Sequence, residues 1–224
     1  MAMDSLIKLS GFLGTFMALD QGLTMICHNP YYLVHAIHNG FIVYYTLPDV
    51  INTITDYKNL HTYPTNMTAI LLCFALHIYH TIVYYKKFRY DDWLHHILMI
   101  CFALPIPLFY ESHTLIGYSL FFTTGLPGGI DYTLLFAVRN GLINKMTEKK
   151  INSWLNTWIR SPGCISHAII IAMTLFANYK NPLSLDFLLQ LMPGLLVFWN
   201  GQYFMRQVVE DYAVQRYQLT NQEE

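Results

Sequence analysis

The side chains most capable of chemistry lie at residues 92–96, where Asp92 precedes the adjacent pair His95 and His96. A short basic run comes just before them: Lys86, Lys87 and Arg89. Imidazole titrates near neutral pH, so it can accept or donate a proton, act as a nucleophile or bind a metal ion. A carboxylate such as Asp92 can orient the ring and stabilise its charged form. This stretch is therefore the first candidate site.

Two more histidine pairs, His35/His38 and His77/His80, are spaced i, i+3, which places each pair on one face of a helix. Tyr79 lies beside His80. Two further polar residues fall inside apolar segments: Asp131 and His167. A single histidine in such a segment is best interpreted as forming a structural hydrogen bond between helices. Several histidines at one depth instead indicate a functional site.

The composition indicates that lipid surrounds these residues. The chain has 224 residues, of which 54% are hydrophobic and 12% charged, against about 25% charged in a typical soluble domain. The net charge of −1 and the absence of a basic stripe exclude a nucleic-acid partner. The four cysteines have no paired spacing, which predicts free buried thiols and neither disulfides nor a zinc site.

Six apolar segments are long enough to be transmembrane helices, since a span needs about 20 mostly apolar residues. They are residues 31–51, 67–85, 94–111, 114–138, 164–180 and 185–206. Segment 5–27 is marginal, because Asp20 and Gln21 near its end would be costly in hydrocarbon. The sequence predicts an all-α, polytopic membrane helix bundle with six to seven transmembrane helices.

The expected organisation has three parts. Residues 1–28 form a marginal transmembrane or interfacial segment, residues 29–208 the membrane domain, and residues 209–224 a polar cytosolic tail that is disordered from Gln218.

Lysine and arginine are distributed unequally between the two sides of the predicted bundle. One side carries Lys58 and Lys180. The other carries Lys86, Lys87, Arg89, Arg139, Lys145, Lys149, Lys150, Arg160, Arg206 and Arg216. Because cytosolic loops are enriched in these residues, loops 86–93 and 139–162 and the C-terminus are expected in the cytosol.

Within the longest basic loop, Trp154 and Trp158 predict an amphipathic helix lying on the cytosolic membrane interface. Arg139, Arg160 and Arg206 are interpreted as helix-end charges that snorkel to the interface.

Counting depth from the predicted helix starts brings seven histidines to a similar level near the cytosolic side. They are His35, His38, His77, His80, His95, His96 and His167, joined by Asp131. His61 and His113 fall on the opposite side. Ionisable groups inside a membrane usually face the bundle interior, so these residues predict a polar cavity that is open to the cytosol.

The order of these features resembles the TLC domain family, which includes ceramide synthases and translocon-associated proteins. The resemblance covers residues 29–208 and rests on Asn29–Ala36 with His35, on Leu76–His80, on Asp92-x-x-His95-His96 and on Thr123–Pro127. It implies an endoplasmic reticulum or related endomembrane protein of lipid metabolism. A glutamate expected before Pro127 is missing, and only Glu111 and Asp131 supply acids after the histidines.

Our first hypothesis is therefore a protein that binds or senses membrane lipids and adjusts lipid homeostasis. The head group of the lipid would lie near His95 and His96. The lining of its cavity would include His35, His38, His77, Tyr79, His80 and His167.

The second hypothesis is an acyl-CoA-dependent N-acyltransferase acting on a long-chain base. His95 or His96 would be the base or acyl acceptor, and Asp92 or Asp131 would orient the ring. Lys86, Lys87 and Arg89 would bind the phosphates of acyl-CoA, the co-substrate.

Two other hypotheses stay open. One is a membrane hydroxylase or desaturase with histidine metal ligands, although Asp92 occupies a place where such boxes have histidine. The other is a structural membrane protein with satisfied histidines. No tightly bound cofactor and no metal are expected, and a homo-oligomer is left open.

Overall fold

The structure is a computed structural model that describes residues 3–56, 59–60, 63–64, 66–109, 114–178, 180–182 and 184–223. Lys58, His61, Glu111 and His113 lie outside the described residues. In chain order the α-helices are α1 (Met3–Leu23), α2 (Pro30–Thr55), α3 (Met67–Tyr84), α4 (Tyr90–Leu98), α5 (Pro105–Phe109), α6 (Thr114–Leu120), α7 (Leu126–Arg139), α8 (Lys145–Leu155), α9 (Ser161–Asn178) and α10 (Leu185–Glu223). The described residues form no strand, so the all-α prediction is confirmed.

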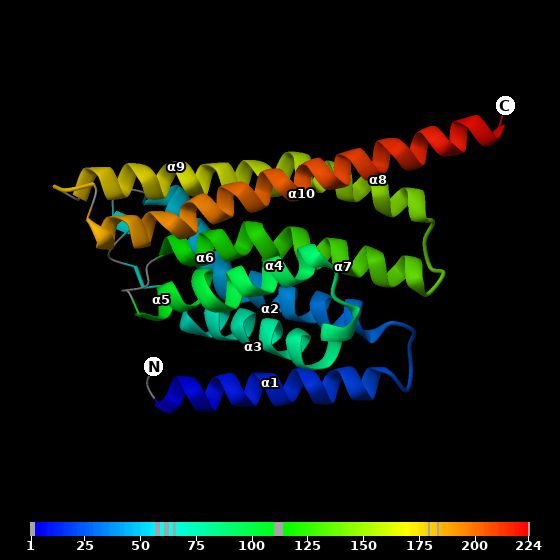
Figure 1. Ribbon diagram of the computed structural model, residues 1–224, viewed down its shortest axis with the longest axis horizontal. Coiled ribbons are helices and arrows are strands. Elements are labelled where there is room, and N and C mark those ends of the chain that lie inside the picture. Colours follow the sequence, from blue (N-terminus) through cyan, green and yellow to red (C-terminus); the bar gives the residue numbers. More distant parts are fainter. Residues whose placement is uncertain are drawn as a thin grey trace.

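Several of these helices are joined end to end by irregular helical turns. A 3-10 turn follows α3 at Tyr85–Lys87, and π-helical turns occupy Met99–Ala103, Phe121–Gly125 and Asn156–Arg160. The π-helical turns connect α4 to α5, α6 to α7 and α8 to α9. The described chain therefore forms seven long helical rods. Each rod runs antiparallel to the one before it (Figure 1).

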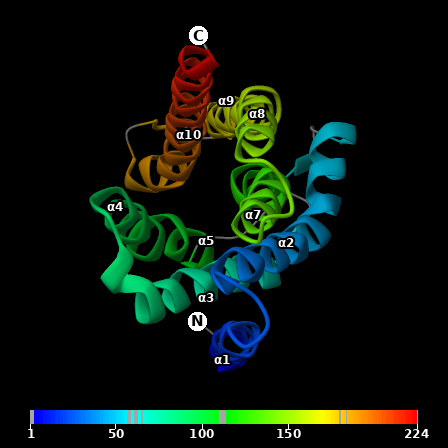
Figure 2. The ribbon, with the colours of Figure 1, turned by 90° about the vertical axis from the view of Figure 1, so that its right-hand side faces the viewer.

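Six of the rods line a common cavity and are arranged in a ring (Figure 2). Going round the ring they are α2, α3, α4–α5, α10, α8–α9 and α6–α7. The closest packing is between α9 and α10 and between α2 and the α6–α7 rod. Helix α1 lies outside the ring and packs on α3, where Phe16 of α1 joins a core cluster with Ile70 and Tyr79.

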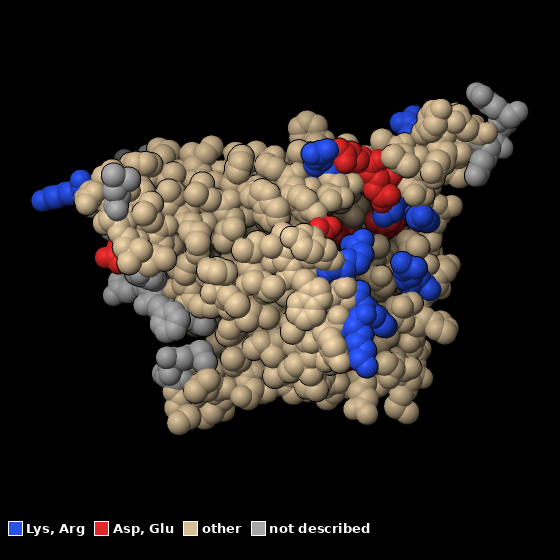
Figure 3. Space-filling model, viewed as in Figure 1, with Lys and Arg blue, Asp and Glu red and all other residues tan. Residues whose placement is uncertain are grey.

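One end of the bundle carries most of the positive charge. The connections at residues 24–29, 85–89 and 140–144 lie together at this end, which we call the basic end (Figure 1). Lys and Arg side chains gather there on the face drawn in Figure 3, beside a hollow that Asp and Glu also border. Most of the charges that the sequence assigned to one side of the bundle thus gather at one end, whereas Arg160 lies inside the bundle.

Asp20, the residue that made the first segment marginal as a span, has a partner in the folded chain. It lies in the last turn of α1 and is only 7% exposed. The hydroxyl of Tyr84 in α3 donates a hydrogen bond to Asp20 Oδ1 at 2.8 Å. This contact lowers the cost of burying the carboxylate.

The number of membrane spans is a separate question from the number of rods. Two helical stretches, Met67–Lys87 and Lys145–Asn178, are long and apolar enough to cross a membrane. The predicted six to seven spans are not confirmed by this criterion.

Two predictions about the segments expected in the cytosol are wrong. Residues 145–178 form one continuous rod, so the amphipathic part does not lie across the bundle as a separate interfacial helix (Figure 1). Three of the buried residues in this part, Glu148, Asn152 and Asn156, are polar and one, Leu155, is apolar, whereas Trp154 and Trp158 are exposed. The polar tail is also ordered, because α10 continues through Gln218 to Glu223.

Candidate functional site

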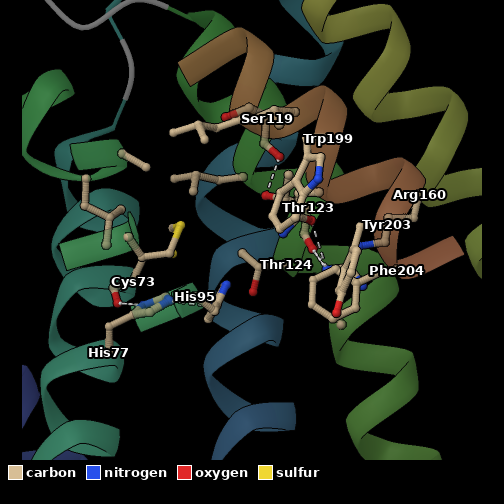
Figure 4. A pocket seen from close by; sticks show the side chains of 18 of the residues that line it. Cys73, His77, His95, Ser119, Thr123, Thr124, Arg160, Trp199, Tyr203 and Phe204 are labelled. Carbon is tan, nitrogen blue, oxygen red and sulfur yellow. Dashed lines mark hydrogen bonds between the residues drawn. The ribbon is translucent and has the colours of Figure 1, made fainter. Parts of the chain in front are cut away.

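The ring of helices encloses a cavity of about 670 Å³. This volume is in the range of small-molecule sites, roughly 300–1,000 Å³. Its lining comes from α2, α3, α4–α5, α6–α7, α8–α9 and α10. Figure 4 shows a histidine wall, with His77 and His95, facing Arg160 and Tyr203 across the space. The site is therefore built from all six rods of the ring.

The polarity of the lining changes along the cavity. Near the basic end it is rich in histidine and carries aspartate and Arg89. Farther along the rods, the walls are mainly apolar, with Leu104, Ile116, Ile171, Leu175 and Leu196 among the lining residues. Such a cavity is suited to a molecule with a polar head and an apolar chain.

Most of the predicted site residues do meet in this cavity. Those that line it are His35, His77, His80, Arg89, Asp92, His95, His96, Asp131 and His167. Four predicted members do not: His38, Tyr79, Lys86 and Lys87. The structure thus brings nine of the thirteen predicted residues to one cavity and leaves four outside it.

His38 and Tyr79 are buried on the side of the ring that faces α1. The ring of Phe16 lies 5.7 Å from that of His38 and 6.1 Å from that of Tyr79. His38 Nδ1 lies 2.9 Å from Asn39 Oδ1. Three residues rotate a helix by about 300°, so His35 and His38 point about 60° apart. That difference sends His35 into the cavity and His38 into the α1 contact.

Lys86 and Lys87 lie on the surface in the turn after α3 and are exposed. Their ammonium groups lie over the rings of Tyr85 and Tyr84, at 5.9 and 5.3 Å from the centroids. Of the basic run predicted to bind phosphates, only Arg89 reaches the cavity lining.

The two carboxylates that were predicted to orient a histidine ring form hydrogen bonds with other groups. Asp92 Oδ2 accepts a hydrogen bond of 2.8 Å from the backbone N–H of Arg89, which caps the start of α4. Asp131 Oδ1 accepts a bond of 2.6 Å from Asn152 Nδ2. Among the hydrogen bonds of the described residues, neither carboxylate orients an imidazole, which corrects the role predicted for both.

Backbone carbonyls orient the histidine rings instead. His77 Nδ1 lies 2.7 Å from the Cys73 carbonyl, and His96 Nδ1 lies 2.7 Å from the Asp92 carbonyl. A carbonyl oxygen can only accept, so each Nδ1 must carry the proton. In the neutral ring, Nε2 of His77 and of His96 is then an acceptor.

Each of these acceptors faces a second histidine. His77 Nε2 lies 3.2 Å from His95 Nε2, and His96 Nε2 lies 3.3 Å from His80 Nδ1. His95 must therefore donate from Nε2 and His80 from Nδ1. The network thus forms two oriented imidazole pairs, His95 to His77 and His80 to His96.

In each pair, the ring that donates the hydrogen bond keeps a free lone pair on its other nitrogen. In the neutral pairs the acceptor nitrogens are His95 Nδ1 and His80 Nε2, and the buried His80 Nε2 has no hydrogen-bond partner. His96, by contrast, uses both of its nitrogens. The best-placed proton acceptor in the buried wall is thus His80, which the sequence assigned only to the lining.

Aromatic stacking fixes the same part of the wall. The His35 ring is stacked on His80 and on Tyr132, with both centroid distances 4.1 Å. His35 Nδ1 bonds to the Tyr31 carbonyl at 2.6 Å. Stacking and hydrogen bonding together hold these rings in defined positions.

His167 lines the cavity at another depth than predicted. Its rod begins at Lys145 rather than near residue 164, so His167 lies 22 residues along it. This corresponds to roughly 33 Å at the rise of an α-helix. His35 is only five residues into α2. The histidine cluster therefore has six members at most on one level, and His167 belongs to the far part of the lining.

Sequence analysis missed Arg160, which it placed at a helix end. The residue ends the π-helical turn in the middle of the α8–α9 rod and lines the cavity. Its Nη2 donates a bond of 2.6 Å to the Thr123 carbonyl, and its guanidinium lies 4.7 Å from the centroid of the Phe204 ring. The arginine is an internal residue of the site (Figure 4).

Prolines mark the positions of the π-helical turns in the sequence. Each π-helical turn ends two residues before a proline: Pro105, Pro127 or Pro162. A proline in a helix removes a hydrogen bond to the carbonyl four residues earlier, and π-turns are common at functional sites. For Pro127 that carbonyl belongs to Thr123, the group that Arg160 binds. All three turns contribute residues to the cavity wall.

Within the described part of the chain, no three His, Cys, Asp or Glu side chains are arranged to hold one metal ion. The geometry thus lends no support to the metalloenzyme hypothesis. In comparisons with known proteins, no protein family, no curated protein and no solved structure matches the chain.

Proposed function

We propose that this protein is an integral membrane protein that binds a membrane lipid, or a single-chain amphiphile derived from one, in the cavity between its helices. The observation that carries the proposal is the polarity of the lining, which is histidine-rich at the basic end and apolar beyond it. The head group would lie among the histidines, and one apolar chain would lie along Ile116, Ile171 and Leu175.

The outer surface supports a membrane location. Large apolar side chains are exposed on rods of the ring, including Phe41 on α2, Ile169 and Met173 on α9 and Phe198 on α10. A water-soluble protein seldom exposes an apolar surface of this kind. Two stretches also satisfy the length and composition of a membrane span.

We place the basic end in the cytosol, because cytosolic loops are enriched in lysine and arginine. The resemblance to the TLC family adds the endoplasmic reticulum as the expected membrane. This orientation is tested by labelling single cysteines in a background without the four native thiols. One cysteine replaces Leu142 at the basic end, and the other replaces Lys180 at the opposite end. An impermeant maleimide should label Leu142→Cys but not Lys180→Cys in sealed microsomes. The reverse pattern would overturn the orientation.

Lipid binding is supported better than acyl transfer. His80 Nε2 has the free lone pair that a general base needs. However, neither Asp92 nor Asp131 orients a ring, and only Arg89 of the expected phosphate-binding residues lines the cavity. Binding requires only the cavity and its polarity, both of which are present.

The experiment is mass spectrometry of the purified full chain under conditions that preserve bound lipids. We expect one amphiphile per chain to remain bound after detergent exchange removes the loosely associated lipids. A chain that keeps no lipid beyond what an unrelated membrane protein keeps, after the same treatment, would disprove the proposal.

A further inference from the structure

Arg160 is a cation in an unusual place. It lies 15 residues from the start of the 34-residue helix Lys145–Asn178, about 23 Å along it at the α-helical rise. A charged side chain at such a depth is costly, and an intramembrane arginine normally faces a cavity and has a partner. Arg160 does face the cavity.

The partners of its guanidinium are all neutral. They are the Thr123 carbonyl at 2.6 Å, the side-chain oxygens of Asn156 and Asn200, each at 3.5 Å, and the ring of Phe204. None of the ion pairs formed by the described residues includes Arg160. Asp131 lines the same cavity and its carboxylate attracts the guanidinium at longer range, but it forms no salt bridge with Arg160.

One donor of the guanidinium also lacks a partner. Arg160 Nε is buried without a hydrogen bond. An unsatisfied donor on an unpaired buried charge is destabilising. The arrangement would be relieved by an anionic oxygen in the cavity, because arginine binds carboxylate and phosphate through charge-assisted hydrogen bonds.

The surroundings of Arg160 indicate where the rest of such a ligand would lie. Beyond it, the walls formed by Ile171, Leu175 and Leu196 are apolar. On the other side are the imidazole pairs, which are neutral when oriented as described and so supply no anionic group that could bond directly to Arg160. The position between them suits the junction of an anionic head group and an alkyl chain.

We propose that Arg160 is the counter-charge for the anionic head group, a carboxylate or phosphate, of the amphiphile bound in the cavity. This inference rests on the proposed lipid-binding function and adds a specificity to it. Neutral lipids with the same chain would bind more weakly, because they leave the arginine unpaired.

The test compares three probes with the same alkyl chain on the full chain in detergent: oleate, oleoyl lysophosphatidate and oleyl alcohol. At a pH where both anions are ionised, we expect at least one anion to bind the wild-type protein about 10-fold or more tightly than the alcohol. The tighter of the two anions identifies the head group.

Matched variants assign the preference to one residue. Arg160→Gln should reduce the ratio of alcohol to anion dissociation constants to about one. Arg206→Gln is the control, since the Arg206 side chain is 77% exposed on α10 and should leave the ratio unchanged. If Arg160→Gln does not fold, the role of Arg160 is tested with Arg160→Lys and with the comparison of the three probes on the wild-type protein.

The outcomes separate the two proposals. Equal affinity of the wild-type protein for all three probes, or an unchanged preference in Arg160→Gln, would overturn the role of Arg160 while leaving lipid binding intact. Failure of every probe to bind would overturn both.

Discussion

At the scale of single residues, polar side chains between the rods are held by partners from other helices. Asp20 and Tyr84 join α1 to α3 in this way, through a hydrogen bond of 2.8 Å. A buried carboxylate that loses such a partner bears a desolvation cost with no compensation. This single contact therefore contributes to the docking of α1.

Tyr84→Phe should lower the free energy of unfolding by about 1–2 kcal/mol, because it removes the hydroxyl that donates to Asp20. The neighbouring Tyr85 is 47% exposed, so Tyr85→Phe is a matched control that should change little. Thermal unfolding of the purified chain in detergent measures both. Equal midpoints for the two variants would show that the Asp20 contact does not stabilise the fold.

Residue types and depth were enough to predict that the histidines converge, but they did not predict the partners. Helix rotation decides that His35 enters the cavity while His38 faces α1. The i, i+3 spacing alone does not fix that rotation. The orientation of each imidazole was equally hidden, because it depends on backbone carbonyls such as those of Cys73 and Asp92.

At the scale of the elements, proline-linked π-helical turns shape the site. They place Thr123, Asn156 and Arg160 in the cavity wall and keep the rods continuous. The apolar segments were sufficient to predict most of the rods. The start of the α8–α9 rod at Lys145 was missed because its first turns are polar, even at the buried positions Glu148 and Asn152.

Glycines next to these turns allow close helix packing. A Cβ added at Gly163 in α9 would lie 2.7 Å from Phe122 Cβ in the π-helical turn before α7, and closer still to the ring. Gly163→Ala should therefore lower the free energy of unfolding by about 1–3 kcal/mol through overpacking.

The control for this variant is Gly40→Ala in α2, where no atom beyond the adjoining residues and backbone of the helix itself lies within 4 Å of the added Cβ. Alanine is the better helix former, so the variant should be unchanged or more stable by up to about 1 kcal/mol. Thermal unfolding midpoints compare the two variants. A Gly163→Ala protein as stable as Gly40→Ala would contradict the close packing described for this position.

At the scale of the whole molecule, the bundle combines a basic end, an apolar exterior and an internal cavity that changes from polar to apolar. Composition and charge distribution predicted the first two, since both are sums over many residues. The cavity volume and the internal position of Arg160 depend on how six rods pack, which periodicity does not specify. These are also the features on which the proposed function depends.

The most direct test of lipid binding in the cavity uses two adjacent leucines of α10. Leu196 lines the cavity, whereas Leu195 is 57% exposed on the outside. Leu196→Trp fills part of the cavity and should strongly reduce the lipid retained per chain, while Leu195→Trp should retain as much as the wild-type protein. Size-exclusion profiles and unfolding midpoints establish that both variants are folded. Retention of the same lipid by a folded Leu196→Trp protein would contradict a ligand inside the cavity.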